Sequence, residues 1–345
     1  MSAVQERPPS RPEIVDRASL ARTVWSWPGM RAFVAVVLLF AVSPLIALGS
    51  VSETAIISML PFAALTAIVA IGQTLVIQQG GLDLSVPGAI TLSALIVAKF
   101  GADEDWGLST AIVVAIVATS LFGMLSGVVI AVFGLPPLVV TIASNALMIG
   151  AVQAISGGFN AQTTDALSSF ALTRVAGVPV LAWFALVIVI AVHIVLKGTR
   201  VGRRFELVGE NPRSAANIGV ATRGYIISAY WLSAALAAAG GVLLAGLLRS
   251  PTLTAGNDYL LPSIAAVVLG GTALTGGRGS IVGTALGALF LAQLSQLVQT
   301  FTQATAVQNI VQALIIGVGI VAQLQLGGNP GRLKSLFRIS RNTHP

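Results

Sequence analysis

The stretch VPVLAWFALVIVIAVHIVLKGTRVGRRFELVGENPRSAANIGVATRG, residues 178–224, contains the contrast that decides the fold. Its first part, residues 178–196, is almost entirely apolar and close to the length of about 20 residues that a membrane-spanning helix needs. Its second part, residues 197–224, holds six of the 19 Lys and Arg residues and two glutamates, so it must lie in water. An apolar span followed by a basic loop is typical of a membrane protein whose loop lies on the cytoplasmic side.

The composition of the whole chain indicates the same class. Of its 345 residues, 55% are hydrophobic and 9% are charged, whereas a typical soluble domain has about 25% charged residues. Without cysteine the chain has no disulfide, thiolate nucleophile or Cys-ligated metal. Residues 1–30 lack the apolar core and cleavage site of a signal peptide, so we expect the first helix to remain as an anchor. The basic residues flank apolar segments, which argues against a nucleic-acid partner.

Apolar segments of spanning length recur along the chain and predict an all-α, polytopic membrane bundle of about ten transmembrane helices. The third and eighth segments are short and bordered by Gly and Pro, so we expect them to be tilted or broken. The predicted spans are residues 32–49, 54–78, 86–100, 108–134, 138–156, 178–196, 225–248, 259–273, 281–302 and 306–326.

The distribution of positive charge predicts the orientation of this bundle. With the N-terminus in the cytoplasm, the inside segments hold all Lys and Arg residues except Lys99, Arg174 and Arg249, a strong positive-inside bias. Both termini are therefore expected in the cytoplasm. This gives a cytoplasmic tail over residues 1–31, one transmembrane domain over residues 32–326 with its long loop at 197–224, and a basic cytoplasmic tail over residues 327–345.

The inventory of reactive residues excludes several classes of membrane protein. The chain has two histidines and no pair of carboxylates inside a predicted span, which argues against an integral-membrane enzyme. None of its three lysines follows the glycine-rich turn of a phosphate-binding loop, so ATP hydrolysis must come from a partner. Glu53, Asp83 and Asp258 fall at predicted helix ends, which argues against coupling to protons or sodium.

Uncharged polar residues within the spans are the candidates for a substrate pathway. Amide side chains offer both hydrogen-bond donors and acceptors, which suits a polyhydroxylated or zwitterionic solute that must be released again. They could equally form hydrogen bonds between helices, and the sequence leaves both roles open. The candidates are Gln73, Thr74, Asn145, Gln153, Gln293, Gln296, Gln308 and Gln312.

Glycine and proline predict where the backbone turns and where helices pack closely. Rows of small residues at four-residue spacing, such as Gly279, Gly283 and Gly287, predict close helix packing within the chain. The alternative is that they form a dimer interface between two chains. Asp83 is expected to cap the helix that follows it, with a direct transport role as the alternative. The expected structural turns contain Gly80, Gly81, Asp83, Pro136, Pro137, Gly270 and Gly271.

Four segments in order along the chain carry a family resemblance. They are GQTLVIQQGGLDLSVPGAITLSALI (72–96), GLPPLVVTIASNALMIG (134–150), TRVGRRFELVGENPRSAANIGV (199–220) and LPSIAAVVLGGTALTGGRGSIVGTALGALF (261–290). Together they resemble the membrane permease subunit of bacterial ABC sugar importers of the ribose, xylose and galactose type. The resemblance implies a multi-pass protein of the bacterial inner membrane. It also implies a dimer with a second permease chain, identical or not, two cytoplasmic ATPase subunits, and a periplasmic or lipid-anchored sugar-binding protein.

The resemblance further implies that the long loop couples the permease to its ATPase, which binds ATP and Mg, whereas this chain holds no cofactor. Within the loop, GENPRSAANIGV predicts a turn at Asn211–Pro212 and a short helix capped by Asn211 or Ser214. Alternatively, the loop is a solvated basic segment that only sets topology. The predicted coupling residues are Arg203, Arg204, Glu210, Asn211, Arg213, Ala215, Ala216 and Gly219.

The predicted function is transport without catalysis: a permease subunit that passes a pentose or hexose from the binding protein to the cytoplasm by alternating access. One alternative is the same architecture with a branched-chain amino acid, a nucleoside or a sugar-like signalling molecule as cargo. A more distant alternative is an ATP-independent facilitator or secondary carrier.

Overall fold

The computed structural model describes residues 28–102 and 106–302, and also residues 304, 306, 307, 309–311, 313, 314 and 317. The tails at 1–27 and 318–345, the acidic residues 103–105 and most of the predicted span 306–326 lie outside the described residues.

Seven helices in the described part are long and apolar enough to cross a membrane, which confirms a polytopic helical membrane protein. Two of the predicted spans are short helices, as their lengths in the sequence indicated. The long helices are α2 (Pro28–Ile46), α3 (Glu53–Gln78), α5 (Gly107–Phe133), α6 (Pro137–Ser156), α8 (Val180–Gly198), α11 (Thr222–Leu248) and α13 (Ile281–Phe301). The short ones are α4 (Val86–Phe100) and the 3-10 helix η1 (Ala255–Tyr259) with its continuation α12 (Leu260–Leu269).

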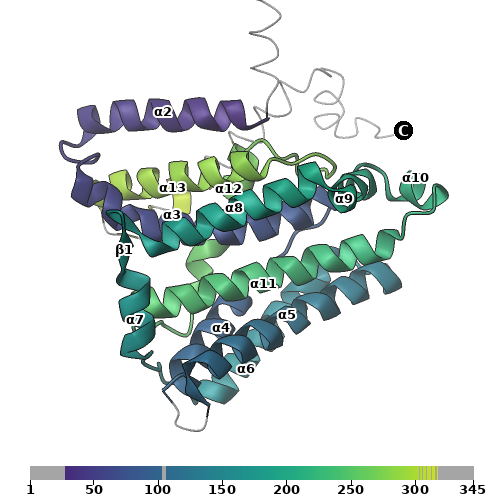
Figure 1. Cartoon of the computed structure of the whole chain (residues 1–345), viewed down its shortest axis with the longest axis horizontal. Coiled ribbons are helices and arrows are strands. Elements are labelled where there is room, and N and C mark those ends of the chain that lie inside the picture. Colours follow the sequence, from purple (N-terminus) through teal and green to yellow (C-terminus); the bar gives the residue numbers. More distant parts are fainter. Residues whose placement is uncertain are drawn as a thin grey trace, which may run out of the picture.

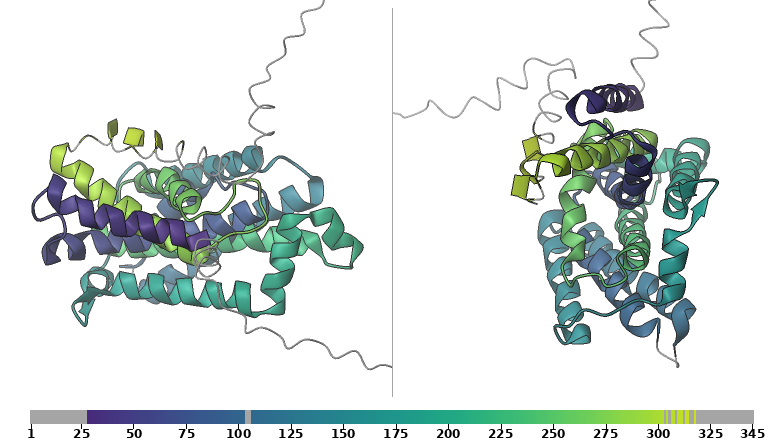
Figure 2. Two further views of the ribbon diagram at one scale, coloured as in Figure 1. Left: turned by 90° about the horizontal axis from the view of Figure 1, so that it is seen from above. Right: turned by 90° about the vertical axis from the view of Figure 1, so that its left-hand side faces the viewer.

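The long helices run in similar directions, with small elements at the two ends of the bundle (Figure 1). One end carries α7 (Asp165–Leu172) and the antiparallel hairpin of β1 (Arg174–Val175) and β2 (Val178–Pro179). The opposite end carries α9 (Arg200–Glu210) and α10 (Pro212–Asn217). Many of the helices are seen nearly end-on in the right-hand view of Figure 2. The bundle therefore has two distinct ends, one with the hairpin and one with α9 and α10.

Helix α11 packs through glycine contacts against α3, α4 and α5. A methyl group at Gly72 of α3 would lie 2.9 Å from the Cα of Ser233, and one at Gly127 of α5 would lie 2.8 Å from the Cα of Ile227. At Gly241 of α11 a methyl group would overlap α4. The predicted row of Gly279, Gly283 and Gly287 likewise packs on Gln78, Gly270 and Ala266, so it serves packing within the chain.

The two short helices begin next to each other inside the bundle. The backbone N–H of Gly256 in η1 donates to the Oγ1 of Thr91 in α4 at 3.1 Å, and the absence of a side chain at Gly256 lets it approach Pro87. From this contact α4 runs toward the hairpin end, whereas α12 runs toward the opposite end, where Gly270 packs against Gly283. Short helices that start inside a bundle expose unpaired N–H groups there, which need polar partners.

The segment that leads into α4 corrects one expectation from the sequence. Asp83 lies in the short connection between α3 and α4 but is buried inside the bundle, since it is 1% exposed. Its carboxylate accepts a hydrogen bond from Ser233, which lies eleven residues beyond the start of α11, or about 17 Å along that helix. A carboxylate at this depth was not predicted, since Glu53, Asp83 and Asp258 were all expected at helix ends.

Candidate functional site

A pocket of about 590 Å³ opens between α3, α11, α13 and the η1–α12 pair. It lies in the half of the bundle that carries the hairpin, because it uses the first half of α3 and the last parts of α11 and α13. In the orientation predicted from the charge bias this is the outer half. The lining residues are Ser58, Met59, Phe62, Thr66, Leu244, Leu248, Thr252, Ala255, Asp258, Tyr259, Pro262, Leu291, Ala292, Ser295, Gln296, Gln299 and Asn309.

The lining combines neutral polar groups with apolar and aromatic surface. Amides and hydroxyls come from α3, α13 and the segment after α11, and the ring of Phe62 is 46% exposed. Asp258 is the one acidic residue, and the described lining contains no Lys, Arg or His. Such a surface can exchange hydrogen bonds with an uncharged solute and pack against its apolar faces.

Of the predicted pathway residues, Gln296 of α13 lines this pocket. Its Oε1 is buried and has no hydrogen-bond partner among the described residues. Gln153 lies elsewhere, on an exposed face of α6. Gln308 and Gln312 lie outside the described residues.

The other predicted pathway residues form hydrogen bonds inside the bundle, away from the pocket. The Oγ1 atoms of Thr74 in α3 and Thr284 in α13 are 2.8 Å apart. The Oδ1 of Asn145 accepts from the backbone N–H of Gly88 at 2.8 Å, and the Nε2 of Gln293 donates to the Oγ of Ser43 at 3.0 Å. These contacts correspond to the other role left open by the sequence, hydrogen bonding between helices.

Gln73 and Asp83 belong to one buried polar cluster. The Nε2 of Gln73 donates to the backbone carbonyl of Asp83 at 2.6 Å, and its Oε1 accepts from the Asp83 N–H at 3.4 Å. One carboxylate oxygen of Asp83 accepts from the N–H of Ser85 at 3.0 Å and from its hydroxyl at 2.5 Å. The other accepts from the Ser233 hydroxyl at 2.8 Å. The cluster joins α3, the start of α4 and α11.

The predicted turns fall where the chain changes direction. Gly80 and Gly271 have φ angles of +77° and +85°, a conformation that favours glycine. Gly81 packs against the hydroxyl of Tyr230, with no room for a side chain. Pro136 precedes α6 and Pro137 is its first residue, where a missing N–H costs little.

At the opposite end, the basic loop folds into α9 and α10. The Oδ1 of Asn211 accepts from the Ser214 N–H at 3.0 Å and so caps α10, as the residue pattern predicted. Helix α9 was not predicted, although Gly202, Phe205 and Val208 recur every three residues and form its buried face. That period was the signal for a helix packed on the bundle.

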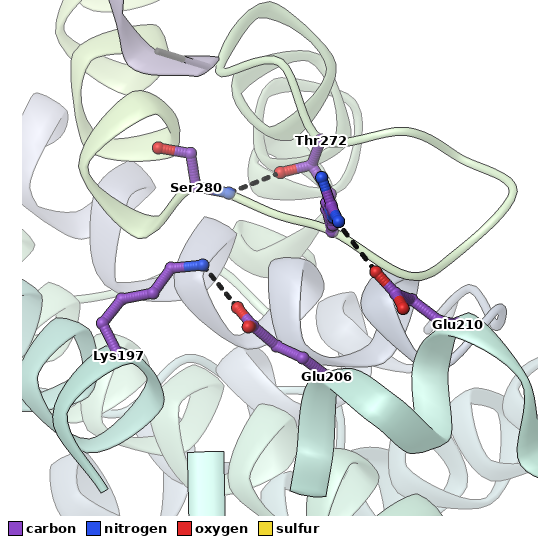
Figure 3. A network of polar contacts seen from close by, with 6 residues as sticks. Lys197, Glu206, Glu210, Thr272 and Ser280 are labelled. Carbon is purple, nitrogen blue, oxygen red and sulfur yellow. Dashed lines mark hydrogen bonds and ion pairs between the residues drawn. The ribbon is translucent and has the colours of Figure 1, made fainter. Parts of the chain in front are cut away.

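Two ion pairs hold α9 to the rest of the chain (Figure 3). Lys197 at the end of α8 pairs with Glu206, and Arg278 pairs with Glu210 through Nε and Oε1 at 3.0 Å. Arg278 belongs to the loop between α12 and α13, in which the Oγ1 of Thr272 accepts from the Ser280 N–H at 3.2 Å. Glu210, a predicted coupling residue, is thus held within the chain.

The other predicted coupling residues form an exposed surface around α9 and α10, except that Ala215 is 3% exposed and packs inward. Gly219 has a φ of +80° and ends this segment. The exposed members are Arg203, Arg204, Asn211, Arg213, Ala216 and Gly219.

Comparison with known proteins decides the family. Residues 55–320 match the family described as "Branched-chain amino acid transport system / permease component". The chain belongs to this permease family. The match covers the pocket, the basic loop and all the motifs that carried the resemblance, and it confirms that the chain is a multi-pass transport permease.

Sequence relatives of this permease include import permeases for ribose and for autoinducer 2. It is 30% identical to the ribose import permease protein RbsC of Haemophilus influenzae over 303 residues, 86% of this chain and 93% of the relative. The corresponding Escherichia coli K12 protein is 32% identical over 75% of this chain and 82% of its own length. The autoinducer 2 import permease LsrD of an Enterobacter strain is 31% identical over 79% of this chain and 82% of its own length. No solved structure matches the permease.

Proposed function

We propose that this permease is the membrane subunit of an ATP-binding-cassette importer and carries a monosaccharide across the bacterial inner membrane. The observation that carries the proposal is the pocket, whose described lining is rich in hydroxyls and amides, partly aromatic, and charged only at Asp258. Hydroxyl groups of a sugar can donate to and accept from such side chains, and the sugar's C–H faces can pack against a ring such as Phe62.

The charged groups of the described lining indicate which class of solute the pocket can bind. The carboxylate of an amino acid would need a cation or the N-terminus of a helix close to it. The described lining supplies Asp258 and no basic residue, and the first N–H groups of η1 already donate to Thr252, Thr91 and Thr254. This favours an uncharged solute over a branched-chain amino acid. Sugar-like signalling molecules fit the same chemistry, and the autoinducer 2 permeases among the relatives favour them as a second candidate.

The partners that we propose follow from the energy source and the family. The match to a permease component is consistent with ATP hydrolysis by separate subunits, so we propose two cytoplasmic ATPases that bind ATP and Mg and contact α9 and α10. A second permease chain would complete the pathway, and a solute-binding protein would deliver the sugar at the hairpin end. The chain itself is proposed to hold no cofactor and to catalyse no reaction.

Alternating access is the mechanism that we propose for this arrangement. The pocket is accessible in one half of the bundle, while Thr74 and Thr284 close the contact between α3 and α13 toward the other end. ATP binding to the partners would favour a second state in which this contact opens. Binding energy shifts such an equilibrium only through contacts that differ between the two states, and exposed α10 offers such contacts.

The test is reconstitution in liposomes with a candidate ATPase subunit and a candidate solute-binding protein from the same organism. Uptake of labelled ribose, xylose, galactose, autoinducer 2 and leucine is measured with and without ATP. We expect ATP-dependent uptake of one sugar or sugar-like molecule and no uptake by the permease alone. ATP-dependent uptake of leucine would contradict the cargo class, and uptake by the lone chain would contradict the importer.

A further inference from the structure

Three segments far apart in the sequence meet at the end of the bundle that carries α9. They are the end of α3 at Gln78 and Gln79, the last turn of α9 at Gly209 and Glu210, and residues 276–279 of the loop between α12 and α13. We call this contact the junction. It lies beside the proposed ATPase surface and about 18 Å along α3 from Thr66, the lining residue of α3 nearest to it.

The junction is held by backbone contacts more than by charge. The N–H of Gly277 donates to the carbonyl oxygen of Gln78 at 2.9 Å. Gly209 packs on the same carbonyl so closely that a methyl group there would overlap it. The Nε2 of Gln79 donates to the carbonyl of Phe205 at 2.9 Å, which fixes α9 to the end of α3. These contacts involve backbone atoms. A displacement of α9 must therefore either move the end of α3 and the loop with it or break the contacts.

The side-chain amide of Gln78 at the junction is buried without hydrogen bonds. It is 0% exposed, and neither its Nε2 nor its Oε1 has a hydrogen-bond partner among the described residues. Gly279 packs directly on this amide and leaves no room for another side chain. A buried amide that lacks partners is costly, so an arrangement that pairs it would be favoured. The junction therefore has a physical reason to adopt a second arrangement.

The loop at the junction connects two helices that line the pocket farther along their length. It connects α12, which contributes Pro262 to the lining, with α13, which contributes Gln296. Gly270, at the end of α12, packs against Gly283, so the two helices are held together beside the loop. A shift of the loop would therefore move both helices at the pocket.

We propose that the junction of Gln78, Gly209 and Gly277, with the Glu210–Arg278 ion pair, passes displacement of α9 and α10 to α12 and α13 and so sets the width of the pocket. This inference rests on the proposed function for its biological role. These side chains act as positioning residues, since none of them lines the pocket. Glu210 is thereby assigned to a contact within the chain in place of a direct contact with the ATPase.

A matched pair of glycines tests the backbone part of this proposal without any partner protein. The chain has no native cysteine, so spin labels at Ser58→Cys in α3 and Gln299→Cys in α13 report the pocket width in nanodiscs. We expect Gly209→Ala to shift or broaden the distance distribution by about 1–2 Å. The control is Gly224→Ala in α11, where a methyl group meets no atom within 4 Å. An unchanged distribution in Gly209→Ala would overturn the inference.

Charge reversal tests the junction in a second way, which remains informative if Gly209→Ala fails to fold. Glu210→Arg and Arg278→Glu alone should each lower ATP-dependent uptake about two- to fivefold, the range of an exposed ion pair, and together they should restore it. Lys197→Glu with Glu206→Lys is the matched control, because that pair joins α9 to α8, which does not line the pocket. Equal effects of the two pairs, or no restoration, would contradict the inference.

The two experiments separate this inference from the proposed function. If Gly209→Ala changes the pocket width but the wild-type complex shows no ATP-dependent uptake, the proposed transport function is refuted. The inference that the junction controls the pocket width is then still supported. If uptake depends on ATP but the label distances are the same in Gly209→Ala as in the wild type, the proposed transport function is supported and the role of the junction is refuted. The label distances therefore test the junction whether or not the partners are the ones proposed.

Discussion

Replacement of Asp83 by alanine tests whether the buried carboxylate holds α4 to α11. In the folded chain this side chain accepts two hydrogen bonds from Ser85 and one from Ser233. A hydrogen bond to a charged group contributes about 1.5–3 kcal/mol, and a buried donor left unpaired costs about 1–3 kcal/mol. Ser233 can turn to a carbonyl of its own helix, as Ser93 does, whereas Ser85 precedes its helix and cannot.

In Asp83→Ala the backbone N–H and the hydroxyl of Ser85 remain without an acceptor, and this determines the expected loss in the free energy of unfolding. We expect Asp83→Ala to lower the free energy of unfolding by about 3–5 kcal/mol. Asp83→Asn should cost about 1–2 kcal/mol, because the amide oxygen can still accept from Ser85 while its NH₂ group donates to Ser233.

The assay is reversible unfolding in mixed micelles by SDS, followed by the fluorescence of the five tryptophans. Asp165→Ala is the control, because its side chain is 97% exposed and lies 3.7 Å from Arg249. We expect this control to unfold at the wild-type SDS fraction. If Asp83→Ala stays within about 1 kcal/mol of wild type, the carboxylate does not bind α4 to α11 as we argue.

Three further predictions concern packing, the pocket and the coupling surface. Gly241→Ala should reduce the yield of monodisperse protein on size exclusion, since the methyl group would overlap α4, while Gly150→Ala, which meets no atom within 4 Å, should not. Gln296→Ala should raise the KM for solute uptake about tenfold by removing a buried hydrogen-bonding group, and Gln153→Ala on exposed α6 should leave it unchanged. Arg213→Glu on the exposed face of α10 should uncouple ATP hydrolysis from uptake without loss of the proposed dimer; tight coupling in this variant would contradict the proposed contact between α10 and the ATPase.

The sequence predicted the helices well because hydrophobic length and caps are local properties. A run of apolar residues must span the membrane as a helix wherever its neighbours lie, since its backbone has no other partners in lipid. In the same way, Asn211 caps α10 through residues within three positions of itself. The helical period of Gly202, Phe205 and Val208 shows that α9 could also have been found.

The sequence could not predict which polar residues face the pocket. In a helix such as α3, apolar residues lie on all sides, so periodicity does not distinguish a face toward lipid from a face toward another helix. Gln73 and Gln296 are both amides within predicted spans, yet Gln73 binds the backbone of Asp83 and Gln296 lines the pocket. The difference depends on the neighbouring helices.

By itself the sequence determined the class of the protein, its spanning helices and the position of its basic loop, because these follow from hydrophobicity and charge along the chain. The tertiary structure decided what those elements do together. It buried Asp83 beside Ser233, 150 residues away, and joined Glu210 to Arg278 across 68 residues. Such contacts depend on how close the glycines let the helices approach, and that proximity is a property of the folded bundle.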